Sequence, residues 1–311
     1  FRRVLFRSCV VLWQLSYKFT YVNLLVRVIA IIVVLVIVNK WTNPANKLSW
    51  TFLILLSPIF GLMVYFLFGR SGLTKHTRER MDAVNRQVEA LFQRDSAEEK
   101  GLEKESRSAY LQSSYIDKWA GFPLYQNTQT KYYSCGEEMF PDMLEALRGA
   151  KHFIFLEYFI IEEGYMFNTI LDILEEKAKA GVDVRFIYDD VGSINSISFG
   201  YYKKLQERGI PCVTFNPFKP LISVVMNNRD HRKIFVVDGY IGFTGGINLA
   251  DEYINKVKRF GYWKDTGVRI EGEAVWSLTA MFLEMWNYIN RSTEDYSRFL
   301  PSVYREKEFT S

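Results

Sequence analysis

Residues 228–248 read NRDHRKIFVVDGYIGFTGGIN, and this stretch decides how the fold and function of the chain are interpreted. It contains the pattern H-x-K-x4-D at His231, Lys233 and Asp238, and six residues later Gly-Gly-Ile-Asn at 245–248. The apolar run between the lysine and the aspartate predicts a buried strand, and the Asp-Gly pair after it is typical of a hairpin turn. The stretch therefore predicts two antiparallel strands, with reactive side chains on the first.

The residue types of this stretch suit chemistry at a phosphate group. Two residues apart on a strand, His231 and Lys233 are expected on the same face. The imidazole can supply an attacking nitrogen, and the ammonium can neutralise the phosphate oxygens as charge builds. Gly245 and Gly246 lack a Cβ, so their backbone amides can approach a phosphate closely, and Asn248 adds a side-chain donor.

A histidine nucleophile also needs an acceptor that holds its second ring nitrogen. Asp238 has the wrong parity to share a strand face with the histidine and lies in the predicted turn, so a structural role is favoured for it within the motif. Asp265, which opens the next predicted strand, is the candidate acceptor, and an exposed strand-end carboxylate is the alternative. Asp251 and Glu252 remain open as other carboxylates near the histidine.

Composition narrows the function classes. The chain has 311 residues and a formal net charge of only +4, which argues against a dedicated nucleic-acid binder. Of its three histidines, His76 lies in a charged stretch and His152 opens a predicted strand, which leaves His231 as the reactive candidate. The three cysteines are scattered, so they predict neither a metal-binding cluster nor a disulfide framework: Cys9, Cys135 and Cys212.

Two apolar stretches near the N-terminus predict membrane helices. The stretches at about 21–38 and 50–68 are each close to the roughly 20 residues that a spanning helix needs. Their short connection contains Asn-Pro, so a two-span transmembrane hairpin is predicted over 21–70, after a basic segment at 1–20. A signal peptide followed by a buried helix is the alternative.

The orientation of the hairpin follows from its basic residues. Pro58 and Gly61 interrupt the second span, and a membrane helix tolerates them when it packs on a neighbour. The connection between the spans contains only Lys40 and Lys47, whereas several basic residues flank the pair, so both ends are expected in the cytoplasm. The flanking residues are Arg2, Arg3, Arg7, Lys18, Arg70, Lys75, Arg78 and Arg80.

Residues 71–118 predict a charged, amphipathic connector helix, because apolar residues recur at spacings of three and four. A solvated charged face is favoured for it over one that lies on anionic lipid headgroups. From 119 to 311 strands and helices alternate, which predicts an α/β lobe with a mixed β-sheet flanked by helices. Helices are expected at 138–149, 167–180, 199–208 and 274–290, and strands at 153–161, 182–188, 211–215, 230–237, 241–244 and 266–270.

Two further features of the lobe have open interpretations. Polar residues at 189–193 (Asp189, Asp190, Gly192 and Ser193) follow a predicted strand, where ligands bind in such sheets, but a turn with helix-capping residues is favoured. The loop at 216–229 contains the apolar run 221–226. That run can admit acyl chains or simply pack as an Ω-loop. Pro141 is acceptable in its predicted helix only within the first turn.

The H-x-K-x4-D stretch resembles the signature of the phospholipase D superfamily, and the surrounding sequence resembles bacterial cardiolipin synthases. The resemblance extends from about residue 21 to the end of the chain and is specific over the motif. The segments that carry it outside the motif are YFLFGR at 65–70, LEYF at 156–159, DDVGS at 189–193 and NLADEY at 248–253.

The resemblance implies that two phosphatidylglycerol molecules condense to cardiolipin and glycerol, through a phosphatidyl-histidine intermediate and without a metal or cofactor. Family members carry two H-x-K-x4-D motifs, and the second histidine acts as general acid and base. This sequence has one motif. Either the chain is a fragment that lacks the second lobe and is inactive alone, which is favoured, or two copies pair to complete the site.

The expected protein is thus α/β, with a two-helix transmembrane hairpin followed by one phospholipase D-like lobe. The expected partners are phosphatidylglycerol, anionic membrane lipid and a second lobe or homodimer partner, and no nucleic acid. The expected location is the bacterial inner membrane, multi-pass, with the catalytic domain in the cytoplasm. A membrane-anchored homodimeric phosphodiesterase acting on phospholipid or nucleic acid, and a non-catalytic membrane scaffold, are the alternative functions.

Overall fold

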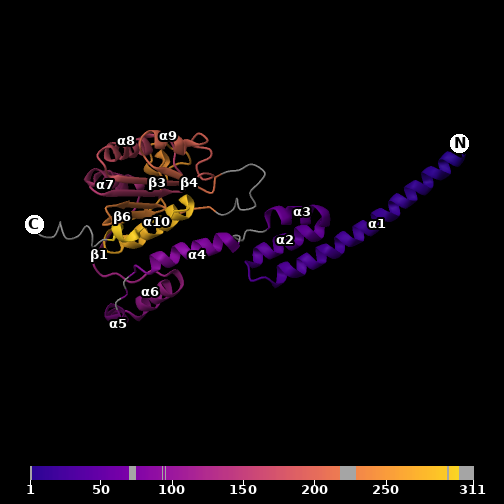
Figure 1. Cartoon of the computed structure of the whole chain (residues 1–311), viewed down its shortest axis with the longest axis horizontal. Coiled ribbons are helices and arrows are strands. Elements are labelled where there is room, and N and C mark those ends of the chain that lie inside the picture. Colours follow the sequence, from indigo (N-terminus) through magenta and orange to yellow (C-terminus); the bar gives the residue numbers. More distant parts are fainter. Residues whose placement is uncertain are drawn as a thin grey trace, which may run out of the picture. The chain divides into compact units, whose positions relative to one another are not determined.

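The helices and strands of the chain fall into two compact units, α1 to α3 and all later elements, and each unit is described by itself (Figure 1). The computed structural model describes residues 2–69, 75–92, 94, 96–217, 229–292 and 294–300. For residues 2–18, 75–77, 96 and 97 it describes the backbone only. The apolar run at 221–226 and the tail from 301 lie outside the described residues.

The N-terminal unit begins with the long helix α1 (Arg2–Asn39). Its part Phe19–Asn39 is 21 residues long and strongly apolar. At 1.5 Å per residue this part is about 31 Å long, close to the thickness of the hydrocarbon core of a bilayer. Within the described residues it is the one helix long and apolar enough to cross a membrane.

The second predicted span is not continuous. The chain forms α2 (Pro44–Leu56) and α3 (Pro58–Phe68), and between them Ser57 is extended, with φ −140° and ψ 87°. Pro58 begins α3 because its ring and its missing N–H are incompatible with a helix that continues from α2. At 13 and 11 residues, both helices are too short to cross a bilayer singly. The prediction of one spanning helix at 50–68 is therefore corrected.

The two short helices fold back on each other. A Cβ on Gly61 would lie 2.6 Å from the Cα of Ile54, so only a glycine permits this approach of the backbones. The ring of Tyr65 packs edge-on against Trp50, with 5.4 Å between the ring centroids. Ile54 and Tyr65 are buried together with residues of α1, so the three helices share one small core.

The larger unit contains a seven-stranded mixed sheet in the order β1-β7-β6-β5-β2-β3-β4. The pairs β2–β3 and β3–β4 are parallel and the other pairs are antiparallel, as expected for a mixed sheet. The strands are β1 (Thr128–Tyr133), β2 (Phe153–Tyr158), β3 (Asp183–Asp189), β4 (Cys212–Phe215), β5 (Ile234–Val237), β6 (Ile241–Gly245) and β7 (Gly267–Gly272). Strand β1 was not predicted.

Helices cover both faces of this sheet, with α7, α8 and α9 on one side and α10 on the other (Figure 1). Alternate residues of β2 enter the two cores, and all six are buried. The helices of the unit are α4 (Lys75–Glu89), α5 (Ser96–Glu105), α6 (Arg107–Ala120), α7 (Gly136–Gly149), α8 (Tyr165–Lys179), α9 (Tyr201–Glu207) and α10 (Val275–Asn290), with 3-10 turns η1 (Asp251–Ile254) and η2 (Tyr296–Phe299).

The predicted Asp-Gly turn is confirmed, whereas the expected position of Pro141 in its helix is wrong. The Asp-Gly turn between β5 and β6 is confirmed, because Asp238 and Gly239 have φ values of 51° and 65°, as a tight hairpin turn requires. Pro141 lies inside α7 and not in its first turn, since that helix begins earlier than predicted, at Gly136. Burial of Met139 and Met143 on the same helix offsets the cost of this proline.

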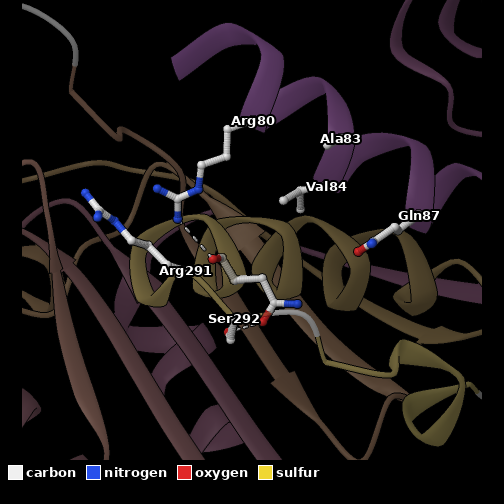
Figure 2. A pocket seen from close by; sticks show the side chains of 7 residues that line it. Arg80, Ala83, Val84, Gln87, Arg291 and Ser292 are labelled. Atoms are coloured by element: carbon white, nitrogen blue, oxygen red, sulfur yellow. Dashed lines mark hydrogen bonds between the residues drawn. The ribbon is translucent and has the colours of Figure 1, made fainter. Parts of the chain in front are cut away.

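The predicted connector helix is three helices, and the first of them packs on the lobe. Val88 near the end of α4 is fully buried in the core under α10, together with Leu91 and Phe92. Arg80 of α4, labelled in Figure 2, donates to the backbone carbonyl oxygen of Asn287 in α10 at 3.5 Å. The same guanidinium donates to the carbonyl of Tyr288. The apolar stripe of α4 thus stabilises the lobe.

The break between α2 and α3 can be tested by cross-linking. With Trp50→Cys and Tyr65→Cys in one chain, a short bis-maleimide is expected to join the two cysteines, because the rings they replace are in contact. A continuous helix would hold these positions about 22 Å apart and give no product. Adding Gly61→Leu is expected to reduce the yield several-fold, since its side chain collides with Ile54. Undiminished cross-linking in that variant would contradict the close approach of the helices.

Candidate active site

The histidine and the lysine of the motif lie just before β5, next to the same aromatic ring. The centroid of the Phe159 ring is 4.6 Å from that of the His231 imidazole. The Nζ atom of Lys233 lies 5.4 Å from the centroid of the same phenyl ring. Both side chains thus contact one ring, as residues on a shared face would, although the paired part of the strand starts only at Ile234.

The two side chains differ in their exposure to water. His231 is exposed, whereas Lys233 is only 4% exposed. Burial lowers the pKa of Lys233 to about 8, and the negative charges of Asp230 and Asp265 oppose this shift. The lysine Nζ also donates a 2.7 Å hydrogen bond to the backbone carbonyl of His231. An ammonium fixed in this way, with little water around it, interacts strongly with an anion bound at the histidine.

Asp265 lies beside this pair, at the start of β7. Its carboxylate accepts a 2.8 Å hydrogen bond from the amide of Thr266 and lies directly against Gly246, where a Cβ would collide with it. It is close enough to Lys233 to raise the pKa of that amine. In the described part of the chain its hydrogen bond goes to Thr266 and not to the imidazole. Orientation of His231 by this carboxylate stays a prediction.

The two glycines after β6 serve close packing against β7. Gly245 has a φ of 149°, and a Cβ on it would collide with the carbonyl oxygen of Thr266. The amide of Gly246 donates a 3.0 Å hydrogen bond to the same carbonyl. These contacts give both positions a structural reason to be glycine. Phosphate binding by their amides stays a prediction.

Asn248 holds the loop that carries the phenyl ring. The side chain is 2% exposed, and its Oδ1 accepts a 3.0 Å hydrogen bond from the amide of Ile160. Its Nδ2 donates to the hydroxyl of Tyr253 at 2.8 Å. Because Ile160 follows Phe159 directly, the asparagine fixes the position of the ring under the histidine. A direct contact of Asn248 with phosphate stays a prediction.

The polar residues after β3 hold the two halves of the site together. Asp189 is 1% exposed, and its Oδ2 accepts a 3.0 Å hydrogen bond from the amide of Asp230, next to the histidine. Ser193 accepts a 3.1 Å bond from the amide of Ile161, and Gly192 leaves room for the carbonyl of Phe159. The predicted turn is confirmed, since Asp189 accepts bonds from the amides of Val191 and Gly192, but the expected helix capping is wrong, because α9 begins only at Tyr201 with Gly200 as its N-cap. What these residues fix is the site.

Sequence reasoning gave no role to Phe159, which the structure places at the centre of this group. The predicted strand at 153–161 contained this residue, whereas β2 ends one residue before it, at Tyr158. Side chains that follow parallel strands meet at one edge of the sheet. Nothing in the sequence showed that the ring would lie under both the imidazole and the ammonium.

Asp238, the third residue of the catalytic motif, lies away from His231 and Lys233. It follows β5, at the end of that strand opposite to His231. Its Oδ2 accepts a 2.8 Å hydrogen bond from the amide of Lys151, and its Oδ1 accepts bonds of 2.7 and 2.8 Å from the amides of His152 and Phe153. The aspartate thus fixes the start of β2, as its parity suggested.

No group of three or more His, Cys, Asp and Glu residues in the described part of the chain is arranged to hold a metal ion. The chemistry that the geometry shows is that of an exposed imidazole next to a buried ammonium.

Comparison with known proteins agrees with this chemistry. The family described as cardiolipin synthase, PLD-like domain, matches residues 143–286, and the family described as phospholipase D-nuclease N-terminal matches residues 28–70. The first match contains β2 to β7 and every residue of the site named above.

Individual relatives are longer than this chain. An uncharacterized protein of Streptococcus mutans is 40% identical over 273 residues, which are 88% of this chain and 59% of that protein. Cardiolipin synthase 1 of Bacillus cereus is 36% identical over 288 residues, 90% of this chain and 55% of the relative. The chain thus spans about half the length of the curated relatives it matches.

Among solved structures, the phospholipase D family member Nuc from Salmonella typhimurium is similar to part of the chain. The match has a TM-score of 0.39 and 23% sequence identity, and it covers 54% of this chain and 97% of that one.

The structural role of Asp238 predicts a loss of stability. Asp238→Ala leaves three backbone amides without their acceptor, so the free energy of unfolding is expected to fall by about 1–3 kcal/mol. Urea denaturation of the purified protein measures this change. Asp172→Ala, which removes an exposed partner of Arg208, is the control and is expected to change the unfolding free energy by less than about 0.5 kcal/mol. An unchanged stability of Asp238→Ala would contradict the role.

The lowered pKa of Lys233 predicts a pH-dependent anion affinity. The amine is charged below its folded pKa of about 8 and loses its proton as the pH rises through that value. Sulfate, whose charge is constant in this range, is expected to bind progressively more weakly above about pH 8 in calorimetric titrations. Lys233→Arg keeps its charge and is expected to remove this dependence. An affinity of the unaltered protein that stays constant up to the usual lysine range would show that the ammonium does not contact the anion.

Proposed function

The chain belongs to the phospholipase D superfamily, in its cardiolipin synthase branch, and from this premise we propose that it is a membrane phosphatidyltransferase. It transfers a phosphatidyl group from one phosphatidylglycerol to a second and so forms cardiolipin and glycerol. The observation that carries the proposal is the exposed His231 imidazole beside the buried Lys233 ammonium, both on one phenyl ring.

In the first step, a ring nitrogen of His231 attacks the phosphorus of phosphatidylglycerol. A phosphorus–nitrogen bond forms, the phosphorus–oxygen bond to the glycerol headgroup breaks, and the departing oxygen takes a proton. The ammonium of Lys233 neutralises the charge on the phosphoryl oxygens. In the second step, a hydroxyl of another phosphatidylglycerol attacks the same phosphorus, gives up its proton and releases the histidine.

Other residues of the site support these steps. Asp265 holds the second ring nitrogen of the histidine as the imidazolium forms, and its position beside Lys233 supports this role. The amides of Gly245 and Gly246 and the side chain of Asn248 complete the phosphate-binding region. No metal or cofactor takes part in either step.

Both steps need a proton donor and acceptor opposite His231. The other histidine with a described side chain, His152, lies at the start of β2, at the far end of that strand from Phe159. We assign the proton transfers to a second catalytic lobe or to a second copy of this chain. Either one places another histidine against the open side of the phosphate.

The helix α1 anchors the enzyme where its substrate is. Its apolar part is about as long as the hydrocarbon core is thick, so the lobe is tethered at the surface of the bilayer that contains its lipid substrate. We place the protein in a bacterial cell membrane. The flanking basic residues predict a cytoplasmic lobe only if the chain crosses the bilayer twice, and α2 and α3 are each too short to make the second crossing.

A phosphodiesterase is the second candidate function, and the exposure of His231 favours it. Water that reaches the phosphatidyl-histidine can replace the second lipid as the nucleophile. The products then differ, because hydrolysis releases phosphatidic acid whereas transfer releases cardiolipin.

The intact protein in phosphatidylglycerol vesicles tests the proposal. We expect cardiolipin and free glycerol in equal amounts by mass spectrometry, and a labelled lipid that becomes attached to His231 through an acid-labile bond. His231→Asn is expected to lower the rate at least about 10³-fold, since the nucleophile is lost. His152→Asn is the control and is expected to keep the rate.

Three outcomes separate the candidates. Phosphatidic acid in place of cardiolipin would establish the phosphodiesterase. Lipid products that His231→Asn leaves unchanged would show that the lobe is a scaffold. Cardiolipin formation that depends on His231 but not on a second histidine would contradict the assignment of the proton transfers.

A further inference from the structure

A cluster of charged side chains lies behind the histidine, on the α10 side of the sheet. Glu157 of β2 is fully buried, and its Oε1 lies 2.6 Å from a terminal nitrogen of Arg232. The Nε of the same arginine lies 3.1 Å from Oδ1 of Asp230, which is also buried. Glu284 of α10 faces the arginine from the opposite layer and interacts with it electrostatically.

Arg232 stands between the two reacting residues of the motif, and its side chain points away from them. Alternation along the chain puts His231 and Lys233 on the side of Phe159 and Arg232 on the other side, over the core that contains Ile234. The ion pairs of its guanidinium therefore restrain the backbone of residues 231–233, which carries the imidazole and the ammonium on the opposite face. A shift of this arginine moves both reacting groups.

Asp230, the residue before the histidine, also binds Arg232, the residue after it. Its Oδ1 accepts a hydrogen bond from the backbone amide of Arg232 at 3.2 Å as well as the bond from the side-chain Nε. Its own amide is held by Asp189 at 3.0 Å. The residues before and after His231 are thus both fixed, and the ion pair with Glu157 joins them to the central strand β2 of the sheet.

We propose that Glu157, which is buried, and Arg232, whose side chain is 32% exposed, form a brace that positions His231 and Lys233 for phosphatidyl transfer. The inference rests on the proposed function for its rate effect, but the geometry of the brace does not depend on it. Both are positioning residues, because neither touches the phosphate. This gives a physical role to Glu157, a residue of the LEYF segment that the mechanism otherwise leaves unused.

The environment of Glu157 indicates that the pair serves position more than stability. Burial raises the pKa of this carboxyl well above its ordinary value, and the nearby Asp230 raises it further, whereas Arg232 lowers it. Burying the charge of Glu157 costs about as much as its attraction to Arg232 returns, and apolar residues in place of a buried ion pair often fold as well or better. An ion pair that adds little stability is therefore better explained by a need to fix the position of the neighbouring His231.

This difference supplies the test. Glu157→Gln leaves Arg232 without its buried partner and is expected to lower both the melting temperature and the rate of labelling of His231 by phosphatidylglycerol. The double variant Glu157→Met and Arg232→Met replaces the pair by apolar side chains and is expected to regain the melting temperature. Its rate is expected to remain about 10–100-fold low, because a displaced nucleophile loses its alignment.

A matched ion pair elsewhere on the same face serves as control. Arg185, 8% exposed, pairs with Glu294 at 2.5 Å and lies under α10 away from the motif. Glu294→Gln is expected to lower the melting temperature while the folded protein labels His231 at the ordinary rate. A double variant of the brace that folds stably and labels at the ordinary rate would overturn the proposal.

Hydrogen exchange separates failure of the brace from failure of the proposed function. In the intact protein, the backbone amides of 230–233 are expected to exchange at least about tenfold faster in the double variant than in the unaltered chain, as local restraint is lost. If the unaltered protein forms no phosphatidyl-histidine, the proposed function is wrong. The exchange rates still show whether Glu157 and Arg232 restrain the backbone at 230–233. Unchanged exchange over this segment overturns the brace, whatever the activity.

Discussion

The site depends on one buried carboxylate, that of Asp189 at the end of β3. It accepts hydrogen bonds from the amides of Val191 and Gly192 on one side and from Asp230 and the Arg229 side chain on the other. A carboxylate with so little contact with water is stable as an anion only when such donors surround it. The consequence is that two loops far apart in the sequence are fixed to each other, and these loops position the phenyl ring and the histidine.

Much of this arrangement could be predicted from residue pattern alone. Alternation along a strand placed His231 and Lys233 on one face, and the Asp-Gly pair set the register of the hairpin after them. Parity also indicated that Asp238 serves the fold, which its bonds to the start of β2 bear out. The residue pattern could not show which segments of the backbone lie against these residues. Gly245 and Asn248 suit a phosphate by chemistry, yet in the structure they serve a neighbouring strand and a loop.

The errors elsewhere have the same physical origin. Strand β1 has mostly exposed side chains, so it lacks the apolar alternation by which strands are found, and only its pairing with β7 defines it. Pro58 and Gly61 are compatible both with a kinked membrane span and with a sharp reversal of the chain. Packing between the helices decides which of the two forms. A glycine against Ile54 and a tyrosine against Trp50 make the reversal favourable. Local propensity leaves both outcomes open, and long-range contact decides.

The structural supports of the site leave the imidazole of His231 exposed, and this has a chemical consequence. Phe159, Asp189 and the ion pair of Glu157 with Arg232 hold His231 from below and behind, while the imidazole itself is exposed. A phosphorus atom attacked by this imidazole has its leaving group on the far side, because attacking and leaving atoms lie in line. The proton that the leaving oxygen needs must therefore come from the open side, where the described residues contribute no second imidazole. In the proposed mechanism this donor belongs to a second lobe or to a second copy of the chain, which would approach the phosphate from the exposed side of His231.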